Sequence, residues 1–539
     1  MTTSPRSIPY APVAIRRSGA EVNPWVIAVV VSIATFMEVL DTSIANVSLP
    51  YIAGGLSASV NEATWVLTSY LISNAIILPI SGWLSTVIGR KRFYMSCVAL
   101  FTISSLCCGM APSLSALIFF RVLQGMGGGG LAPSEQAILT DTFPPAKRGM
   151  AFALYGVAVV VAPAIGPTLG GWITDSFTWR WIFFINVPVG MLSLLLSYHV
   201  VRDPPFLVSH RKQILARGIR FDYVGFGLIS LGLASLQVVL DKGQEDDWFG
   251  SNFIKIFFLL AAVGLVCGVI WEMFLVRDPI VQLNLLRQRT FFASNAVMLA
   301  LGIFLFGSTV LLPLLCQTLL GYTAMQSGLV ITPGGVAIMA MMPVVGYLTG
   351  KVEARWLVLF GLVMSFFALR HMTNFDLGTS YGYLAVARIF QAVAIAFLFV
   401  PINTAAYAGL RREDSNNASA LLNLFRNIGG SFGISVVTTI LARRSQFHQS
   451  VLVSRFTPFN PHYLAAQHSL TRTLMSQGVN AVLASHKATA TLMSMVERQA
   501  SMLSYNDAFW VLSIIALVIS PLVFLMRPNR PDQGAPAGH

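Results

Sequence analysis

The sequence predicts an all-α polytopic membrane protein with fourteen transmembrane helices. Of its 539 residues, 55% are hydrophobic and only 11% are charged, and the mean hydropathy is +0.70. That composition is typical of a chain that crosses a bilayer many times. We expect the spans at residues 25–47, 62–81, 93–111, 114–138, 150–174, 181–201, 222–241, 252–274, 292–318, 325–349, 355–373, 382–408, 417–441 and 506–526.

Lysine and arginine are distributed unevenly between the two sides of this predicted bundle. The side that holds both chain ends has clusters such as 90–92, 147–148 and 411–412. The short loops of the other side have only Arg180, Lys242 and Lys255. Because basic short loops stay in the cytoplasm, we expect both termini to be cytoplasmic. The net charge of +13 is therefore a topology signal and does not indicate nucleic-acid binding.

Residues 443–505 form the one long loop between predicted spans, and this topology places the loop outside. It contains a candidate amphipathic helix from Leu464 to Tyr505, rich in Ala, Met, Leu, Ser and Gln. A loop of this length without structure of its own is unusual, which favours internal structure or a binding partner. A self-packed cap on the outer mouth of the protein is the alternative.

Two acidic residues, Glu38 and Asp41, lie deep inside the first predicted span. They are three positions apart, so they share one face of a helix. A carboxylate in hydrocarbon is costly unless it is neutralised, paired or facing water, and acids at such positions are typically functional. We therefore interpret the pair as a proton or cation site. A structural ion pair or a helix cap is the alternative.

Arg121 in the fourth span has nearly the same predicted depth as Asp41. Asp41 precedes Pro50 by roughly 13 Å of helix, and Arg121 follows Leu114 by roughly 10 Å. If such a site alternates between wet and dry states, the proton affinity of Asp41 alternates too, as proton coupling requires. A permanent brace between Asp41 and Arg121 is the alternative.

Two further acids are candidates for proton coupling. Glu38, one turn below Asp41, is expected to share its proton or to meet substrate charge, and two coupled acids titrate as a pair. Glu135 falls near the same face as Arg121, toward the cytoplasmic end of the span. It is either a second protonation site or gate contact, or an interfacial acid satisfied by Lys147 and Arg148.

An internal repeat divides the chain into two six-helix halves, spans one to six and nine to fourteen, with spans seven and eight inserted. Parallel halves of this kind mark a secondary transporter with its site between them. Three matches at nearly one offset define the repeat: Leu49-Pro50 with Leu312-Pro313, Pro79-x-x-Gly82 with Pro343-x-x-Gly346, and Arg121-x-x-Gln124 with Arg388-x-x-Gln391. The corresponding divisions are a cytoplasmic tail at 1–24, a half at 25–201, a linker and inserted pair at 202–274, a half at 275–526 that includes loop 443–505, and a cytoplasmic tail at 527–539.

Five segments resemble the motifs of a known family. They are Leu40–Pro50, Gly82–Arg92, Arg121–Gly125, Ala162–Gly171 and Trp181–Gly190. Together they resemble the major facilitator superfamily and, within it, the fourteen-span drug:proton antiporters, most closely the EmrB-type inner-membrane subunit of tripartite multidrug exporters. The resemblance covers nearly the whole chain and implies the major-facilitator fold.

The loop motif after span two matches the family at Gly82, Gly89, Arg90 and Lys91 but departs from it at Thr86. The family has an acid at that position, so its charge relay to the neighbouring helix is in doubt here. Two interpretations stay open for the loop: a working relay, or orientation by the basic residues together with a tight glycine turn.

The helix-five motif of the resemblance points to export. Prolines kink a helix and small residues let helices approach closely, so we expect a bent, tightly sealed helix that closes a route for leak. Ordinary small-residue packing is the alternative. The motif residues are Pro163, Gly166, Pro167, Gly170 and Gly171.

These observations predict a proton-coupled exporter of hydrophobic or amphipathic compounds that works by alternating access, with the proton gradient as energy source and no cofactor. The resemblance implies the bacterial inner membrane, a periplasmic membrane-fusion adaptor and an outer-membrane channel. A metabolite or fatty-acid exporter on the same fold is the alternative. A membrane-embedded enzyme is disfavoured because no soluble domain and no His-Glu-x-x-His occurs. The five cysteines lack metal-ligand spacing, so no metal site is expected.

Overall fold

The protein is described by a computed structural model, which covers residues 16–17, 20–21, 23–217, 221–276, 279–457 and 459–528. Within these residues, fourteen helical segments are long and apolar enough to cross a membrane. The predicted number of spans and the all-helical fold class are confirmed. Two strands of two residues, β1 (Arg16–Arg17) and β2 (Ala20–Glu21), pair ahead of the first span. The tails predicted at 1–24 and 527–539 lie mostly outside the described residues.

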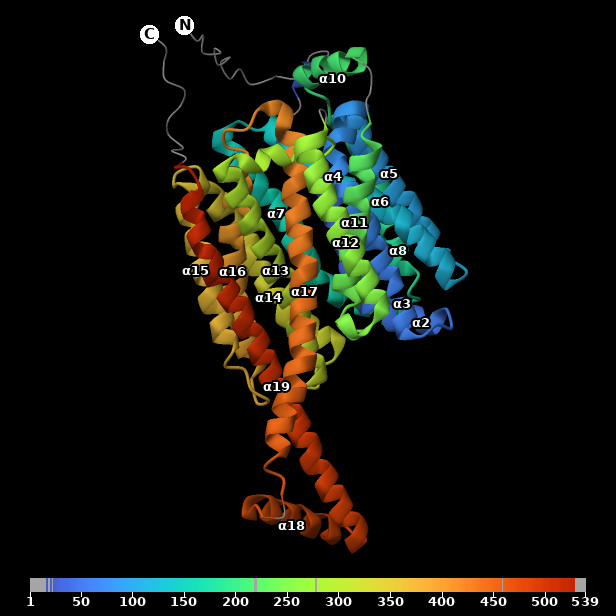
Figure 1. Cartoon of the computed structure of the whole chain (residues 1–539), viewed down its shortest axis with the longest axis vertical. Coiled ribbons are helices and arrows are strands. Elements are labelled where there is room, and N and C mark those ends of the chain that lie inside the picture. The colour runs from blue at the N-terminus through green and yellow to red at the C-terminus, as the bar shows by residue number, and fades with distance from the viewer. Residues whose placement is uncertain are drawn as a thin grey trace.

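The first six spans form the N-terminal half of the bundle (Figure 1). Its first helix, α1 (Pro24–Val47), starts with a proline and is capped by Asn23, whose side chain accepts a hydrogen bond from the Trp25 nitrogen. The other helices are α2 (Leu49–Gly55), α3 (Val60–Ala63), α4 (Trp65–Ile88), α5 (Arg90–Gly109), α6 (Leu114–Thr142), α7 (Pro145–Ser176), α8 (Trp181–Phe184) and α9 (Asn186–Val200).

A run of glycines brings α6 close to its neighbours α4 and α5. A Cβ atom at Gly127 would lie 2.7 Å from the Phe101 nitrogen, and one at Gly129 would lie 2.7 Å from the Asn74 oxygen. No side chain fits at such distances, so only glycine permits this backbone approach. The close packing sets the depth and rotation of α6, which holds Arg121 and Glu135.

The inserted pair lies along one seam between the halves, where α11 packs against α4 and α17, and it is drawn beside α17 in Figure 1. Its helices approach closely, because a Cβ atom at Gly264 would lie 2.7 Å from the Gly232 nitrogen. Asp241 accepts a hydrogen bond from Thr68 of α4, and Gln237 accepts one from Ser431 of α17 at 2.9 Å. The elements of this region are α10 (Pro205–Arg217), α11 (Tyr223–Lys242), η1 (Trp248–Gly250), α12 (Asn252–Ile270) and η2 (Trp271–Leu275).

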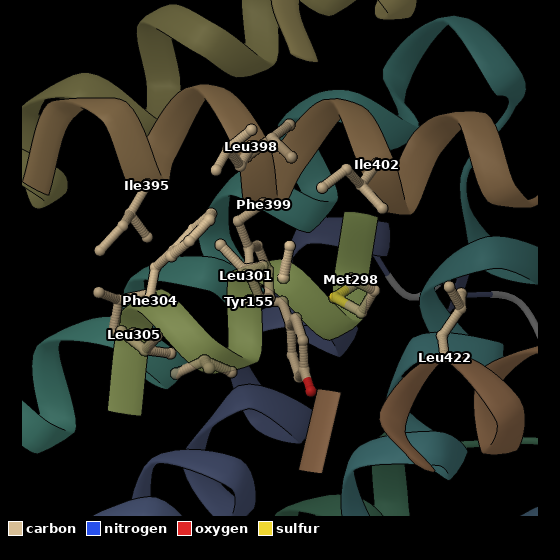
Figure 2. Close-up of a cluster of buried hydrophobic side chains, with 14 of the residues drawn as sticks. Tyr155, Met298, Leu301, Phe304, Leu305, Ile395, Leu398, Phe399, Ile402 and Leu422 are labelled. Carbon is tan, nitrogen blue, oxygen red and sulfur yellow. The ribbon is translucent and has the colours of Figure 1, made fainter. Parts of the chain in front are cut away.

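The last six spans form the C-terminal half, which packs against α7 of the first half. Figure 2 shows Tyr155 of α7 among Leu301, Phe304 and Phe399, and its ring stacks on that of Phe399 with centroids 5.9 Å apart. The elements of this half are η3 (Leu283–Arg287), α13 (Arg289–Thr318), α14 (Ala324–Thr349), α15 (Ala354–Met372), α16 (Tyr381–Ala406), η4 (Arg412–Asp414), α17 (Ser415–Val453), α18 (Pro461–Ser476), α19 (Ala481–Ile519) and η5 (Ser520–Leu525).

The stretch predicted as loop 443–505 is mostly helical. Helix α17 continues to Val453, α18 is a separate helix, and α19 already begins at Ala481. Together they form a projection in which α18 lies far beyond the end of the bundle opposite α10 (Figure 1). The single helix predicted from Leu464 to Tyr505 is therefore wrong. The chain turns at Gly478, which has a φ of +86°, between the end of α18 and the start of α19. Asn480 then caps the first turn of α19.

Candidate functional site

Asp41 of α1 lies at the centre of a buried polar cluster in the N-terminal half. Its Oδ2 accepts a hydrogen bond from Arg121 Nη1 at 2.6 Å. Its Oδ1 accepts from Asn186 Nδ2 at 2.6 Å and from Gln124 Nε2 at 3.0 Å. Asp41 is 2% exposed and Arg121 is 0% exposed. The structure thus brings together the two charges that were expected at one depth, and amide donors complete the carboxylate's hydrogen bonding.

Arg121 is held from several directions. Its Nε donates to the Val66 carbonyl at 3.0 Å, and its Nη1 also donates to Gln124 Oε1 at 2.8 Å. The guanidinium lies over the ring of Tyr70, 4.3 Å from its centroid, and 5.7 Å from that of Phe183. Its Nη2 has no hydrogen-bond partner among the described residues. Arg121 therefore donates from Nε and Nη1 to different elements at once, which the single nitrogen of a lysine cannot do in the same positions.

Glu38 lies one turn from Asp41 and connects to the other half. Its Oε1 accepts hydrogen bonds from the Tyr70 hydroxyl and from Asn74 Nδ2, both at 3.3 Å. Asn74 Oδ1 accepts in turn from Asn427 Nδ2 of α17, also at 3.3 Å. Within the described residues no cation lies within 4 Å of Glu38. Glu38 is thus the acid at the seam between the halves.

Glu135 is completely buried and accepts a hydrogen bond from Thr35 of α1. The prediction that Lys147 and Arg148 satisfy it is wrong. Arg148 instead donates to the carbonyls of Thr140, at 3.1 Å, and Phe143. The physical reason is that α6 runs to Thr142, so Glu135 lies roughly two turns inside the helix rather than at its end.

The C-terminal half repeats the arginine of this cluster but not its acid. Arg388 Nη1 donates to Gln391 Oε1 at 2.6 Å and to Ser308 Oγ at 3.2 Å, and Nη2 donates to Thr309 Oγ1 at 3.5 Å. Arg388 is 4% exposed, and no carboxylate lies within 4 Å of it in the described part of the chain. A serine thus stands against Arg388 where Asp41 stands against Arg121, and the two halves are chemically unequal.

The loop motif contains a buried ion pair that the sequence did not predict. Arg90 is 2% exposed and pairs with Asp141 of α6. Its Nε donates to Asn416 Oδ1 at 2.8 Å, and Asn416 Nδ2 donates to Thr86 Oγ1 at 3.3 Å. Gly89 adopts a φ of +100°, the left-handed conformation of the expected glycine turn. Arg90 therefore links the two halves, and an acid from α6 is present although Thr86 is not one.

The rest of the loop motif packs against α17 and the end of α9. A Cβ atom at Gly82 would collide with the side chain of Asn417 on α17. The Lys91 nitrogen donates to Asp203 Oδ1 at 2.8 Å, and its Nζ donates to the Tyr198 carbonyl at 2.5 Å. Gly82 thus allows the contact between α4 and α17, while Lys91 joins α5 to the chain after α9.

The helix-five motif faces α1. A Cβ atom at Gly166 would collide with Ser43, and one at Gly170 would lie 3.1 Å from the Ile44 side chain. The Pro163 carbonyl accepts a hydrogen bond from Ser43 at 3.4 Å. Pro167 and Gly171 complete this stretch, and α7 stays one continuous helix in spite of its two internal prolines. Close packing against the helix that holds Glu38 and Asp41 is the structural result.

A comparison with known families decides the assignment. The sequence model described as Major Facilitator Superfamily matches residues 31–434. The chain belongs to the major facilitator superfamily. The fold of this superfamily also appears in the solved structure of the proton:xylose symporter XylE, with a TM-score of 0.59, covering 94% of this chain and 97% of that one at 14% identity.

The relatives place the chain among the EmrB-type members of the superfamily, as its motifs predicted. It is 37% identical to the multidrug export protein EmrB of Escherichia coli (strain K12), over 93% of this chain and 95% of the relative. It is 35% identical to the fatty acid resistance protein FarB of Neisseria gonorrhoeae, over 94% of this chain and 96% of that protein. The chain is a multi-pass membrane transporter of the major facilitator superfamily.

The sequence alone did not identify several residues that hydrogen-bond to Asp41, Glu38 or Arg90. Asn186 lay in a family-like segment but was not connected to Asp41. Tyr70 and Asn74 are single polar residues in an apolar helix, and no spacing links them to Glu38. Asp141 had a usable signal, because an acid at the end of the fourth span lies near the basic loop 90–92.

Proposed function

We propose that this chain is a proton-coupled exporter of hydrophobic or amphipathic compounds that works by alternating access. The observation that carries the proposal is the buried pair of Asp41 and Arg121, which joins α1 to α6 and has no acidic counterpart beside Arg388. The second half folds with a serine against its buried arginine, so an acid at this place is not a general requirement of the fold. The printed functions of the relatives, multidrug export and fatty acid resistance, support an export role.

The cluster can couple a proton to a movement of helices. When Asp41 is ionised, its two oxygens hold Arg121, Gln124 and Asn186 on α6 and α9. Protonation removes the charge that holds Arg121, and its guanidinium must find other acceptors. Tyr70 transmits the change, because its ring lies on Arg121 and its hydroxyl donates to Glu38. Glu38 then connects through Asn74 to Asn427 in the other half.

Glu38 and Glu135 are the other candidates for proton transfer. Glu38 lies at the seam and Glu135 lies inside the N-terminal half, and neither has a cation within 4 Å in the described residues. Glu38 is the acid placed to meet the charge of a cationic substrate, since its Oε2 has no partner among the described groups. Glu135 has one oxygen on Thr35 and one without a described partner. The energy source in this proposal is the proton gradient, without a cofactor.

The orientation in the membrane belongs to the same proposal. Basic residues gather at the end of the bundle near α10, so this end is cytoplasmic and holds both termini. The projection formed by α17, α18 and α19 is then periplasmic, in a bacterial inner membrane. Its exposed length fits contact with a membrane-fusion adaptor that leads to an outer-membrane channel, the partners that the EmrB-type resemblance implies.

Transport by purified protein in proteoliposomes tests the function. An inside-acidic pH gradient should drive uptake of a lipophilic dye such as ethidium, and dissipating the gradient with a protonophore should stop it. Substrate addition should also release protons from the lumen in wild-type vesicles but not in Asp41→Asn vesicles. Dye movement that continues unchanged after the gradient is collapsed would rule out proton coupling.

A fatty-acid exporter is the second candidate, and Arg388 favours it. A buried guanidinium without a carboxylate in the described residues suits a substrate that brings its own carboxylate. FarB, a relative at 35% identity, is named for fatty acid resistance. Under this alternative, Arg388→Gln should lower the transport of a long-chain fatty acid much more than that of ethidium. Equal losses for both compounds would exclude a substrate-binding role of Arg388.

A further inference from the structure

A pocket of about 560 Å³ opens in the C-terminal half, away from the acid cluster. It lies where α13 and α15 begin and where α16 and η5 end, so it faces the same side of the membrane as the start of α1. Four arginines line it: Arg287, Arg289, Arg355 and Arg527. Nothing in the transport proposal uses this pocket.

The charge in the pocket is largely uncompensated. Arg355 pairs with Glu353, with Nε and Oε2 2.6 Å apart. Arg287, Arg289 and Arg527 have no carboxylate within 4 Å in the described part of the chain. Like charges gathered around one concave site repel each other unless an anion binds there.

Backbone donors add to this positive field. Helix α13 has 30 residues and α15 has 19, and both begin at the pocket. Neither helix has a side-chain cap, because Gln288 and Glu353 make no capping hydrogen bond. In the first turn of α15 the Trp356 N–H donates to the Glu353 carbonyl at 3.1 Å, and no side chain caps the start of either helix. The dipoles of two long helices therefore point at the pocket and favour an anion.

The pocket has a fixed, apolar floor beneath its basic rim. Ala354, Ala405 and Met526 line it and are buried, at 5%, 4% and 2% exposure. The Arg527 nitrogen donates to Thr290 Oγ1 at 3.0 Å, which ties the end of the last span to the start of α13. An anionic head with an apolar part matches this combination of surfaces.

We propose that this pocket binds a phosphate group, carried either by an anionic lipid headgroup or by a soluble phosphate compound. Planar guanidinium groups bind phosphate oxygens bidentately, as the three unpaired arginines would do here. Basic pockets between transmembrane helices on the cytoplasmic side are typical sites for anionic headgroups. The lipid is the source that the apolar floor and the position at the helix ends favour.

The test compares two variants of the full-length protein in neutral detergent. One variant is Arg287→Gln/Arg289→Gln/Arg527→Gln, which empties the pocket of unpaired charge. The matched control is Arg92→Gln/Lys147→Gln/Lys212→Gln, which removes three exposed positive charges from the same side of the molecule. Phosphatidylglycerol, phosphatidylcholine and inorganic phosphate are titrated separately, and affinity is read from the rise in melting temperature and by native mass spectrometry.

The wild type and the control should bind phosphatidylglycerol at least tenfold more tightly than the triple variant, roughly the effect of one lost charge-assisted hydrogen bond. Binding of phosphatidylglycerol but not of inorganic phosphate identifies a lipid, and binding of inorganic phosphate at least as tightly as phosphatidylglycerol identifies the soluble source. An Arg→Lys version of the triple variant shows that the protein still folds and should retain part of the affinity. The proposal is overturned if the wild type binds neither probe, or if the triple variant binds as tightly as the control.

Discussion

Arg121 and Asp41 form an ion pair between α6 and α1 that is buried on all sides, with Nη1 and Oδ2 2.6 Å apart. In the second half Arg388, the counterpart of Arg121, contacts Ser308 instead of an acid, by a hydrogen bond at 3.2 Å. Each half therefore holds a buried arginine, but only the arginine of the N-terminal half has an acidic partner. This asymmetry separates the requirements of the fold from those of proton coupling.

Asp41→Asn should abolish proton-coupled transport. The amide keeps the size and one acceptor but leaves Arg121 as an uncompensated buried charge, which costs about 3 kcal/mol or more of stability. Proton release in proteoliposomes and the melting temperature measure the two effects. Asp175→Asn is the control, because Asp175 is an exposed acid that accepts a hydrogen bond from the Tyr51 hydroxyl near the C-terminal end of α7.

The double variant Asp41→Asn/Arg121→Gln distinguishes a role of the ion pair in proton coupling from a role in stabilising the fold. Removing both charges should restore most of the lost stability, because no buried charge stays unpaired. If the pair were only a brace, transport would return together with stability. We expect stability to recover while proton coupling stays lost.

Arg121→Lys should impair transport although the charge is kept. Lysine cannot donate to the Val66 carbonyl, Asp41 and Gln124 at once from the positions that the planar guanidinium occupies. The matched substitution is Arg388→Lys, which faces only neutral partners and should be milder. Equal activity of both variants and the wild type, at equal protein levels, would show that a point charge is sufficient at Arg121.

Arg90 and Asn416 should act as one unit that closes the halves against each other. Arg90→Ala and Asn416→Ala each break the contact between α5 and α17, so each should lower the transport rate. Their effects should be strongly non-additive, with a coupling of about 1 kcal/mol or more in a double-mutant cycle. Arg92→Ala, at an exposed neighbour, is the control and should leave the rate unchanged. Additive losses would contradict the prediction that Arg90 and Asn416 act through their shared hydrogen bond.

The sequence predicted contacts correctly where the rise per residue of a helix is enough to place two side chains at the same depth. Asp41 and Arg121 could be paired because depth along a straight helix follows from residue counts. The partners of Arg90 could not, since Asn416 lies 326 positions away and only the packing of the two halves brings it there. The sequence could not predict which residues surround Glu135, because Gly127 and Gly129 set how closely α6 approaches its neighbours.

The projection shows a different limit of sequence reasoning. Hydropathy marks where a helix leaves the membrane, not where it ends. The stretches 442–453 and 481–505 contain neither glycine nor proline, so nothing in them stops α17 or α19 when the apolar run is over. Both helices therefore continue beyond the predicted spans at 417–441 and 506–526 on this side.

The projection should be accessible from outside the cell and should contact a partner protein. Ser454 and Ser476 are exposed, on α17's end and on α18, and can be replaced by cysteine in a background without the five native cysteines. Both should react with an impermeant thiol reagent added to intact spheroplasts. Ser209→Cys on α10, at the opposite end of the bundle, is the matched control and should react only after the membrane is opened. Reaction of Ser209→Cys alone from outside would mean that the orientation is inverted.

Co-expression of the cognate adaptor should then protect at least one of the two outer cysteines. A docked protein excludes the reagent from the surface that it covers, whereas a self-packed cap leaves the labelling of Ser454→Cys and Ser476→Cys unchanged. The comparison is made in a complex that co-purifies, so that missing protection cannot result from missing assembly. Scanning further exposed positions of α18 in the same way would map the contact, because a covered helix face gives protection at every third or fourth residue. Full labelling at every scanned position of an assembled complex would place the adaptor elsewhere on the transporter.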